Sequence, residues 1–232
     1  NLAKIGEIGA PDGTQTNYPL GWAQAANTPF KYWKQDANSE GGTRNPLIVF
    51  APKVIKDPGA IRMQYGHVID VLPTTLQLIG LNVPEYIRGI KQDTLQGTSL
   101  AYSFNDPTAA SKHRIQYYYI FGSRSIYKDG WKAEVYHHPD FTDLTNPGSQ
   151  WKPDSTVNNF DKDVWELYNL NTDYNERVNL ASKYPDRLNE LKALYDEQAK
   201  KNHIYPFIDW EDVLKGRLHH VQSPSADQAK SK

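Results

Sequence analysis

Two lysines in one segment of the chain stand among aromatic residues and close to a glycine pair, which raises the question of a chemical role. Lys31 and Lys34 alternate with aromatic residues in NTPFKYWKQ (residues 27–35), and a turn-forming run then leads to Gly41 and Gly42. A lysine ammonium fixed in a site that excludes water stabilises negative charge far more than one in bulk water. Because glycine lacks a Cβ, we expect the glycine pair to let this loop fold tightly onto the strand that follows. Spacing alone leaves a plain surface lysine as the simpler interpretation of Lys34.

Two adjacent histidines, His137 and His138 in VYHHPD, form a second candidate group. They end a predicted strand, and because neighbouring strand residues point to opposite faces, at most one of them would line a cleft. The alternative is a pair of loop histidines that bind no ligand. Adjacent histidines do not readily chelate one ion and no acidic cluster is spaced to help, so we predict no metal site within this chain. We interpret His67 as a structural histidine that pairs locally.

Composition excludes several classes of protein. The chain has 232 residues, 38% of them hydrophobic and 23% charged, which excludes a disordered chain. No apolar run reaches the roughly 20 residues of a membrane helix, so we expect no membrane partner. With 26 Lys and Arg against 27 Asp and Glu, the net charge is -1 and no basic stripe attracts nucleic acid. The absence of cysteine excludes disulfides and a cysteine nucleophile within this chain.

The first part of the chain has the strand, loop and helix order of an α/β protein. Residues 1–27 are rich in turn formers, and we expect a long surface loop there. Residues 46–51 (PLIVFA) form a continuous apolar run, typical of a strand buried on both faces. Residues 67–80 predict a helix, with Asp70 suited to its N-cap and Gly80 just after its last turn.

The second part of the chain predicts a small antiparallel sheet and one helix. Residues 128–130 (KDG) contain an Asp-Gly pair between two strands, which is a strong hairpin signal. Residues 184–201 have the apolar spacing of an amphipathic helix, with a proline near its first position. The strands are predicted at residues 114–121, 123–127, 131–136 and 163–170.

Four segments in this order resemble parts of the type I sulfatases (arylsulfatases) of the alkaline phosphatase superfamily. They are NTPFKYWKQ with EGGTRNPLIV, then HVIDVLPTTLQLIGL, then GTSL with WKAEVYHHPD, and finally DVWELYNLNTDYNERVNLASKYPDRLNEL. The resemblance runs over residues 18–209, which is most of the chain. It implies that the chain is the C-terminal part of such an enzyme.

The resemblance also implies a fold and its division into domains. Residues 1–104 would be the C-terminal section of the catalytic α/β domain, and so an edge of a large mixed α/β sheet of the alkaline-phosphatase type. Residues 105–215 would form a C-terminal α+β subdomain, a small antiparallel sheet packed on one helix. Residues 216–232 would be a flexible tail, and the boundary between the two domains lies near residues 105–111.

The resemblance further implies roles for individual residues. Lys34 stands four residues after the Phe of TPF, where the family places a catalytic lysine whose ammonium donates to a sulfate oxygen as the ester bond breaks. His137 and His138 become substrate-binding candidates at the rim of the cleft. Lys31 is expected to face solvent. Ser39 stands where many members have a histidine before EGG, so no histidine role is transferred to it and the substrate preference stays open.

Other functional parts of the family are absent from this sequence. It has neither a cysteine nor a Ser-x-Pro-x-Arg run, one of which is the source of formylglycine in sulfatases. We therefore expect formylglycine and the ligands of calcium outside this chain, on an N-terminal half of the same enzyme. That half would be the partner of this chain, which alone is expected to be inactive. Without it, residues 47–50 would be exposed.

Several points stay open at the level of the sequence. The substrate is expected to be a sulfate ester, without indication of which one. A non-catalytic sulfatase-like binding or assembly module is an alternative function, as is part of a related phosphatase or phosphonate hydrolase, although the spacing from TPF to the lysine favours sulfatases. The chain begins without an initiator methionine or a signal peptide, so we expect a processed, trimmed or partial product. Because the family is mostly exported, a periplasmic or secreted location is expected.

Overall fold

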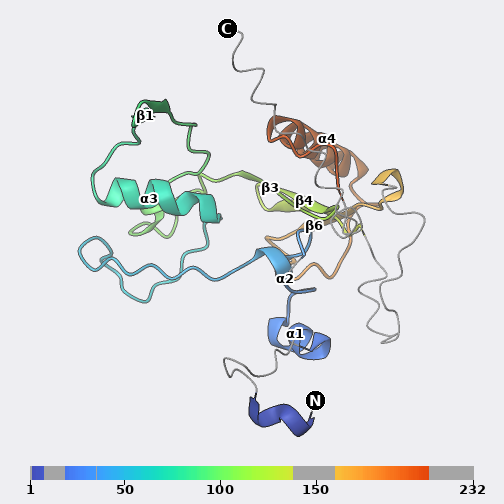
Figure 1. The fold of residues 1–232 in the computed structure, drawn as a ribbon. Coiled ribbons are helices and arrows are strands. Elements are labelled where there is room, and N and C mark those ends of the chain that lie inside the picture. Colours follow the sequence, from blue (N-terminus) through green and yellow to red (C-terminus); the bar gives the residue numbers. More distant parts are fainter. Residues whose placement is uncertain (1, 8–18, 35, 138–159, 209–232) are drawn as a thin grey trace.

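The protein combines a small antiparallel sheet under one long helix with a second group of elements around a shorter helix (Figure 1). The computed structural model describes residues 2–7, 19–34, 36–137 and 160–208. The elements that precede the main sheet are η1 (Leu2–Glu7), α1 (Leu20–Asn27), α2 (Glu40–Thr43), η2 (Val68–Asp70), α3 (Val71–Leu78), β1 (Tyr86–Ile87), β2 (Ile90–Lys91) and η3 (Ala101–Ser103). The mixture of helices and antiparallel sheets confirms the predicted α/β class.

The main sheet contains four antiparallel strands in the order of the chain. They are β3 (Ile115–Ile120), β4 (Ser123–Lys128), β5 (Trp131–Val135) and β6 (Glu166–Asn169), with η5 (Phe160–Lys162) just before β6. Asp129 and Gly130 form the turn between β4 and β5, and both have positive φ values, 50° and 84°. A two-residue turn of this kind matches the twist of the flanking strands. The predicted strands and hairpin are therefore confirmed.

The long helix α4 (Pro185–Lys201) covers one face of this sheet (Figure 1). Pro185 stands in the first turn, where its missing N–H would have no intrahelical partner. Leu191, Tyr195 and Ala199 are spaced four residues apart and are buried against the sheet. Their partners in the core are Ile126, Ala133 and Leu167. The opposite face of β5 is left for the loop that carries Lys34.

The shorter helix α3 is fixed by Asp70, although not in the way the sequence suggests. Asp70 occupies the N-cap position of α3, but its side chain caps no N–H of this helix. The fully buried carboxylate accepts hydrogen bonds from the backbone N–H groups of His67 at 2.8 Å and Thr98 at 2.7 Å, and it pairs with His113 at 2.8 Å. His67 closes a reciprocal capping contact with Asp70, which agrees with its predicted structural role. Gly80, with a φ of 71°, follows the last turn as predicted.

The prediction of a long loop over residues 1–27 is wrong in its described part. Residues 2–7 form η1 and residues 20–27 form α1. The sequence of α1, LGWAQAAN, contains three alanines, the strongest helix former, but no apolar stripe that would announce a helix. Local propensity therefore decided this segment.

Within the described residues, no helix is both long and apolar enough to cross a membrane.

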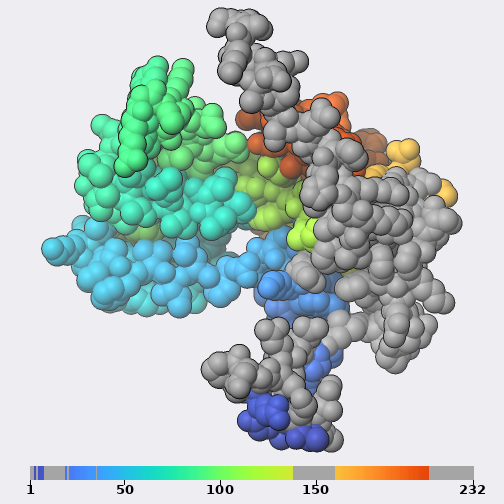
Figure 2. All heavy atoms as spheres, in the orientation of Figure 1, coloured from blue at the N-terminus to red at the C-terminus, as the bar shows by residue number. Residues whose placement is uncertain are grey.

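The apolar run at residues 46–51 is not hydrogen-bonded into a sheet. Its side chains are exposed instead: Leu47 is 58% exposed, Ile48 91% and Phe50 89%. This confirms the expectation that the run lies open when no further strands accompany it. Figure 2 shows the segment in light blue along one edge of the group of atoms that contains α3. The division into domains remains a prediction, and the predicted tail at residues 216–232 lies outside the described residues.

Candidate functional site

Lys34 is exposed in the loop between α1 and α2. The end of α1 fixes this loop, because the side-chain amide of Asn27 donates to the carbonyl oxygens of Tyr32 at 2.7 Å and Gly41 at 2.8 Å. The side chain of Gln24 accepts a hydrogen bond from the Tyr32 N–H at 3.2 Å. Tyr32 has a φ of 61°, so the chain turns sharply two residues before Lys34. The exposed lysine therefore stands on a backbone held at several points.

The glycine pair contacts this same loop and not a strand beneath it, which corrects our expectation. Gly41 and Gly42 lie in the short helix α2. A Cβ on Gly41 would lie 1.9 Å from the carbonyl oxygen of Lys31, and one on Gly42 would lie 2.1 Å from that of Asp36. Both distances are far below van der Waals contact. The two glycines thus let α2 press against the start and the end of the lysine loop.

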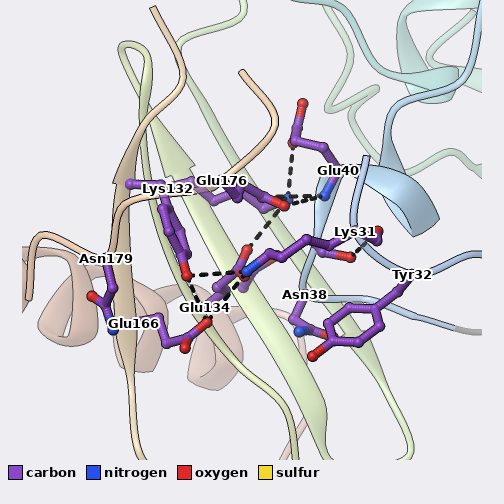
Figure 3. A network of polar contacts seen from close by, with 12 residues as sticks. Lys31, Tyr32, Asn38, Glu40, Lys132, Glu134, Glu166, Glu176 and Asn179 are labelled. Atoms are coloured by element: carbon purple, nitrogen blue, oxygen red, sulfur yellow. Dashed lines mark hydrogen bonds and ion pairs between the residues drawn. The ribbon is translucent and has the colours of Figure 1, made fainter. Parts of the chain in front are cut away.

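A buried network of charges joins the loop and α2 to the sheet (Figure 3). Lys132 on β5 is 1% exposed, and its Nζ lies 2.9 Å from Glu40, 3.3 Å from Glu176 and 3.9 Å from Glu134. It also donates to the hydroxyl of Thr43 at 3.1 Å. The carboxylate of Glu176 in turn accepts the backbone N–H of Glu40 at 3.0 Å. Both ends of α2 are therefore held by Lys132.

Lys31 reaches into the same network from the loop side, so the expectation that it faces solvent is wrong. Its Nζ lies 3.2 Å from Glu134 and 3.4 Å from Glu166, and it donates to the hydroxyl of Tyr168 at 3.0 Å. The ammonium also lies 4.3 Å from the centre of the Tyr168 ring. The physical reason is the pair of carboxylates on β5 and β6, which compensates the loss of hydration of a lysine side chain that is only 29% exposed.

The network shifts the pKa values of its members. Burial alone would lower the pKa of Lys132, but Glu40, Glu176 and Glu134 outweigh it and hold this pKa above 10.5. For Lys31, burial likewise acts to lower the pKa and the carboxylate of Glu134 acts most strongly to raise it, with a raised pKa as the result. Burial, followed by the nearby Glu176, raises the pKa of Glu134 well above 4.5. A proton on Glu134 reduces the excess of carboxylates over ammonium groups in the network.

The sequence analysis missed Lys132 and Glu134, although the sequence does contain a signal for them. They alternate in WKAEV with the core residues Ala133 and Val135, so both must point to the face opposite the core. The register pairs Lys132 with Tyr168 and Glu134 with Glu166 across the neighbouring strand. A polar face with both signs of charge on two adjacent strands indicates an ionic contact with another segment.

The end of β5 lies beside the lysine loop through aromatic contacts. The ring centres of Tyr32 and Tyr136 are 5.2 Å apart, and those of Tyr32 and Trp33 are 6.1 Å apart. The hydroxyl of Ser125 on β4 adds a hydrogen bond of 2.7 Å to the carbonyl oxygen of Ala37. These contacts place the residues around Tyr136 next to the segment that carries Lys34.

His137, the residue after Tyr136, is buried in this arrangement. Its Nδ1 lies 2.9 Å from Asp163, which also accepts a hydrogen bond of 2.7 Å from Arg124. The imidazole stacks on Phe160, with 4.1 Å between the ring centres. Substrate binding by His137 stays a prediction, and His138 lies outside the described residues.

The part of the chain that the structure describes does not fit a calcium site, and the sequence does not fit a formylglycine site. Among the described residues, no group of three or more histidine, aspartate or glutamate side chains is arranged to hold a metal ion. The full sequence contains no cysteine and no Ser-x-Pro-x-Arg run from which formylglycine could form. What the described arrangement offers is one exposed ammonium on a firmly anchored loop, which can bind an anion but cannot by itself cleave a bond.

Comparison with known proteins finds sulfatases as relatives of this chain. No family model matches the chain. It is 33% identical over 172 residues to an uncharacterized sulfatase of Schizosaccharomyces pombe, which covers 73% of the chain and 27% of that protein. It is 28% identical over 183 residues to N-sulphoglucosamine sulphohydrolase of Homo sapiens (68% and 36%), and 25% identical over 206 residues to arylsulfatase J of Mus musculus (79% and 32%). The chain thus spans about a third of the length of these relatives.

Among solved structures, the chain is similar to the crystal structure of Ps i-CgsB in complex with k-i-k-neocarrahexaose. The TM-score is 0.57 at 19% identity, over 88% of this chain and 39% of that one. At this identity the likeness concerns the fold alone.

Proposed function

The chain belongs to the sulfatase family, and from this premise we propose that it is the C-terminal portion of an arylsulfatase-type sulfuric ester hydrolase. Because it spans only 27% of one curated relative and 36% of another, we assign turnover to the complete enzyme and none to this chain alone. The observation that carries the proposal is the lysine loop itself. Lys34 is exposed, while the backbone around it is anchored to the sheet through Lys31 and, by way of α2, through Lys132.

In this proposal, Lys34 binds the sulfate group of the substrate. Its ammonium donates a hydrogen bond to a sulfate oxygen and stabilises the negative charge that grows as the ester bond breaks. A pre-positioned cation does this without reorganisation during the reaction, and this is why the anchored backbone matters. The sulfate ester is the proposed substrate class, without a choice among aryl, sugar and alkyl esters.

We further propose that the segment of His137 and His138 lies at the rim of the same cleft. The packing of Tyr136 against Tyr32 supports this, because it ties the end of β5 to the lysine loop. His137 is paired with Asp163 and stacked on Phe160, so a direct contact with substrate would require this arrangement to open.

The remaining parts of the proposed site belong to an N-terminal half of the same enzyme. Calcium and formylglycine, which the family resemblance implies, are assigned to that half, since the described residues form no metal-binding group and the sequence contains no source of formylglycine. The exposed run at residues 47–50 supports such a partner. A run of four exposed apolar side chains is a feature that added strands of a sheet would cover. A periplasmic or secreted location is proposed on the family resemblance alone.

The proposal is tested in the complete enzyme with Lys34→Met. Removing one group that stabilises charge in the transition state is expected to lower kcat for p-nitrophenyl sulfate by about 10²–10³-fold. Lys53→Met, at another exposed lysine, is the matched control and is expected to leave kcat unchanged. If Lys34→Met retains full activity, the role of Lys34 is refuted. A preference of the wild-type enzyme for p-nitrophenyl phosphate would identify a phosphatase instead.

Association with the N-terminal half is tested by native mass spectrometry of the two portions produced together. The expected species is a complex, and Phe50→Asp, which places a charge in the exposed apolar run, is expected to abolish it. A chain that stays monomeric beside a folded N-terminal half would contradict the proposal and favour a separate binding module. Sulfatase activity of the isolated chain would also contradict it.

A further inference from the structure

The lysine loop is closed by hydrogen bonds among three groups, the hydroxyl of Ser39, the carboxyl group of Asp36 and the carbonyl oxygen of Lys31. Ser39 is fully buried, and its hydroxyl lies 2.8 Å from the carbonyl oxygen of Lys31. The same hydroxyl is hydrogen-bonded to one carboxyl oxygen of Asp36. The other carboxyl oxygen of Asp36 accepts the backbone N–H groups of Asn38 at 2.9 Å and Ser39 at 3.4 Å. The bonds span residues 31–39, and Lys34 lies between them.

The number of hydrogen atoms on these groups determines which group donates and which accepts in each hydrogen bond. A serine hydroxyl has one hydrogen to donate, and the carbonyl oxygen of Lys31 can only accept. When Ser39 donates to Lys31, it can only accept from Asp36. The carboxyl group of Asp36 must then carry a proton and donate it to Ser39. If Asp36 is ionised, the hydroxyl can satisfy the carboxylate or the carbonyl oxygen, but not both.

The surroundings of Asp36 favour the protonated form. Burial raises the pKa of Asp36 from 3.8 to about 6, against the opposing effects of its hydrogen bonds and of Lys132. Two titratable groups of β5 and its end face this carboxyl group. Lys132 attracts the ionised form, whereas Tyr136 has a raised pKa, caused first by burial and then by Asp36, and stays neutral. These surroundings favour the protonated carboxyl group of Asp36 up to a pKa of about 6.

Resting on the proposed role of Lys34, we propose that Asp36 is a positioning residue whose protonated carboxyl group closes the lysine loop through Ser39 and the Lys31 carbonyl oxygen. In the closed loop, the proton of Asp36 points to Ser39 and the proton of Ser39 points to Lys31. Loss of the first proton releases one of the two bonds, and residues 31–39 gain freedom. Ser39 thus has a definite role in this chain, where many relatives were expected to place a histidine.

The first test measures the loop directly, in the 232-residue chain and without any activity assay. Hydrogen exchange of peptides covering residues 31–39 is followed at pH 5 and pH 8 and corrected for intrinsic rates. With a pKa near 6, the protection of the wild-type loop is expected to fall at least about tenfold between these two values. Peptides of β4, residues 123–128, serve as the internal control and are expected to show no such change.

Two variants separate the proton from the mere presence of a polar side chain. In Asp36→Asn, the amide donates to Ser39 at every pH, so protection is expected to stay high and independent of pH. In Ser39→Ala, protection is expected to be low at both pH values. Equal protection of the wild-type loop at pH 5 and pH 8 overturns the proposal, as does an Asp36→Asn variant that still follows pH. Should the variants fail to fold, the carboxyl ¹³C shift of Asp36 in the wild-type chain gives its titration, and a midpoint below pH 4.5 overturns the proposal.

Kinetics in the complete enzyme then distinguish this proposal from the role of Lys34. The wild-type enzyme is expected to show a fall in kcat as pH rises through about 6, and Asp36→Asn is expected to remove this fall. Lys34→Met lowers kcat at every pH instead. If Lys34→Met is fully active while loop protection still depends on pH, the proposed role of Lys34 fails and the closure by Asp36 stands. If the loop is insensitive to pH and Lys34→Met is inactive, only the inference about Asp36 fails.

Discussion

Replacing Lys132 by methionine tests whether the buried charges hold the lysine loop on the sheet. Methionine keeps an unbranched side chain of similar length but removes the ammonium. The substitution leaves Glu40, Glu134 and Glu176, all at most 8% exposed, without the cation that lies within 3.9 Å of each. Lys31 contacts only one of these three carboxylates, Glu134, so it cannot replace the lost charge.

The magnitude follows from the burial of these groups. Removing one partner of a buried ion pair costs about 3–5 kcal/mol, because the remaining charge stays desolvated. Folded domains have a total stability of about 5–15 kcal/mol, so the loss is a large fraction of it. With a denaturant slope of about 2 kcal/mol per molar urea, the unfolding midpoint of Lys132→Met is expected to fall by roughly 2 M.

The assay is urea unfolding followed by circular dichroism, with Lys128→Met as the matched control. Lys128 lies on the adjacent strand and pairs with Glu190 at 2.6 Å, but both side chains are at least 30% exposed. Surface pairs contribute about 0–1 kcal/mol, so the control is expected to change the midpoint little. Adding Glu176→Gln to Lys132→Met removes a carboxylate that the first substitution leaves without an ammonium partner, and it should restore part of the loss. If Lys132→Met and Lys128→Met unfold at the same midpoint, the reasoning about the network is refuted.

Three further predictions concern single positions. Burial raises the pKa of Glu134, so the folded state disfavours its ionised form, and the stability that Glu134 contributes is lost as pH rises above 4.5. Glu134→Gln should therefore gain stability relative to wild type between pH 4 and pH 8. A difference in urea midpoints that does not change with pH would contradict this. Gly42→Ala should lower the free energy of unfolding by about 1–3 kcal/mol in a thermal unfolding scan, because its Cβ would lie 2.1 Å from the carbonyl oxygen of Asp36. Gly21→Ala, which has open space around it, is the control and should be neutral or stabilising in the same scan. Leu191→Ala should cost about 2–5 kcal/mol in chemical unfolding, since Leu191 is fully buried between α4 and the sheet, and a loss below about 1 kcal/mol would mean that α4 is not docked as described.

Sequence reasoning was most reliable where neighbouring residues alone decide the structure. The Asp129–Gly130 turn, Pro185 at the start of α4 and Gly80 after α3 each act within a few residues of their own position, and all three lie where they were expected. The four strands of the sheet were also found, because alternation along a strand is a local pattern. The helix α1 was missed, since its signal is alanine propensity and not periodicity.

The apolar run at residues 46–51 shows a different limit. Its composition is that of a buried strand, but a strand forms only where another backbone supplies hydrogen bonds. Within the described part of the chain no strand pairs with it, and Ile48 and Phe50 are about nine-tenths exposed. The apolar composition of this segment indicates a strand, but the strand forms only when a neighbouring strand is present to pair with it.

The two lysines of the loop show where local sequence information ends and long-range contacts become decisive. From the sequence, the family resemblance predicts that Lys34 occupies the position of a sulfatase lysine, and local patterns indicate a sheet and a helix further along the chain. The sequence alone did not indicate that Lys31, three residues earlier, turns inward while Lys34 stays exposed. Only the tertiary structure decided this, because the carboxylates that compensate the burial of Lys31 belong to Glu134 and Glu166, 103 and 135 residues away along the chain.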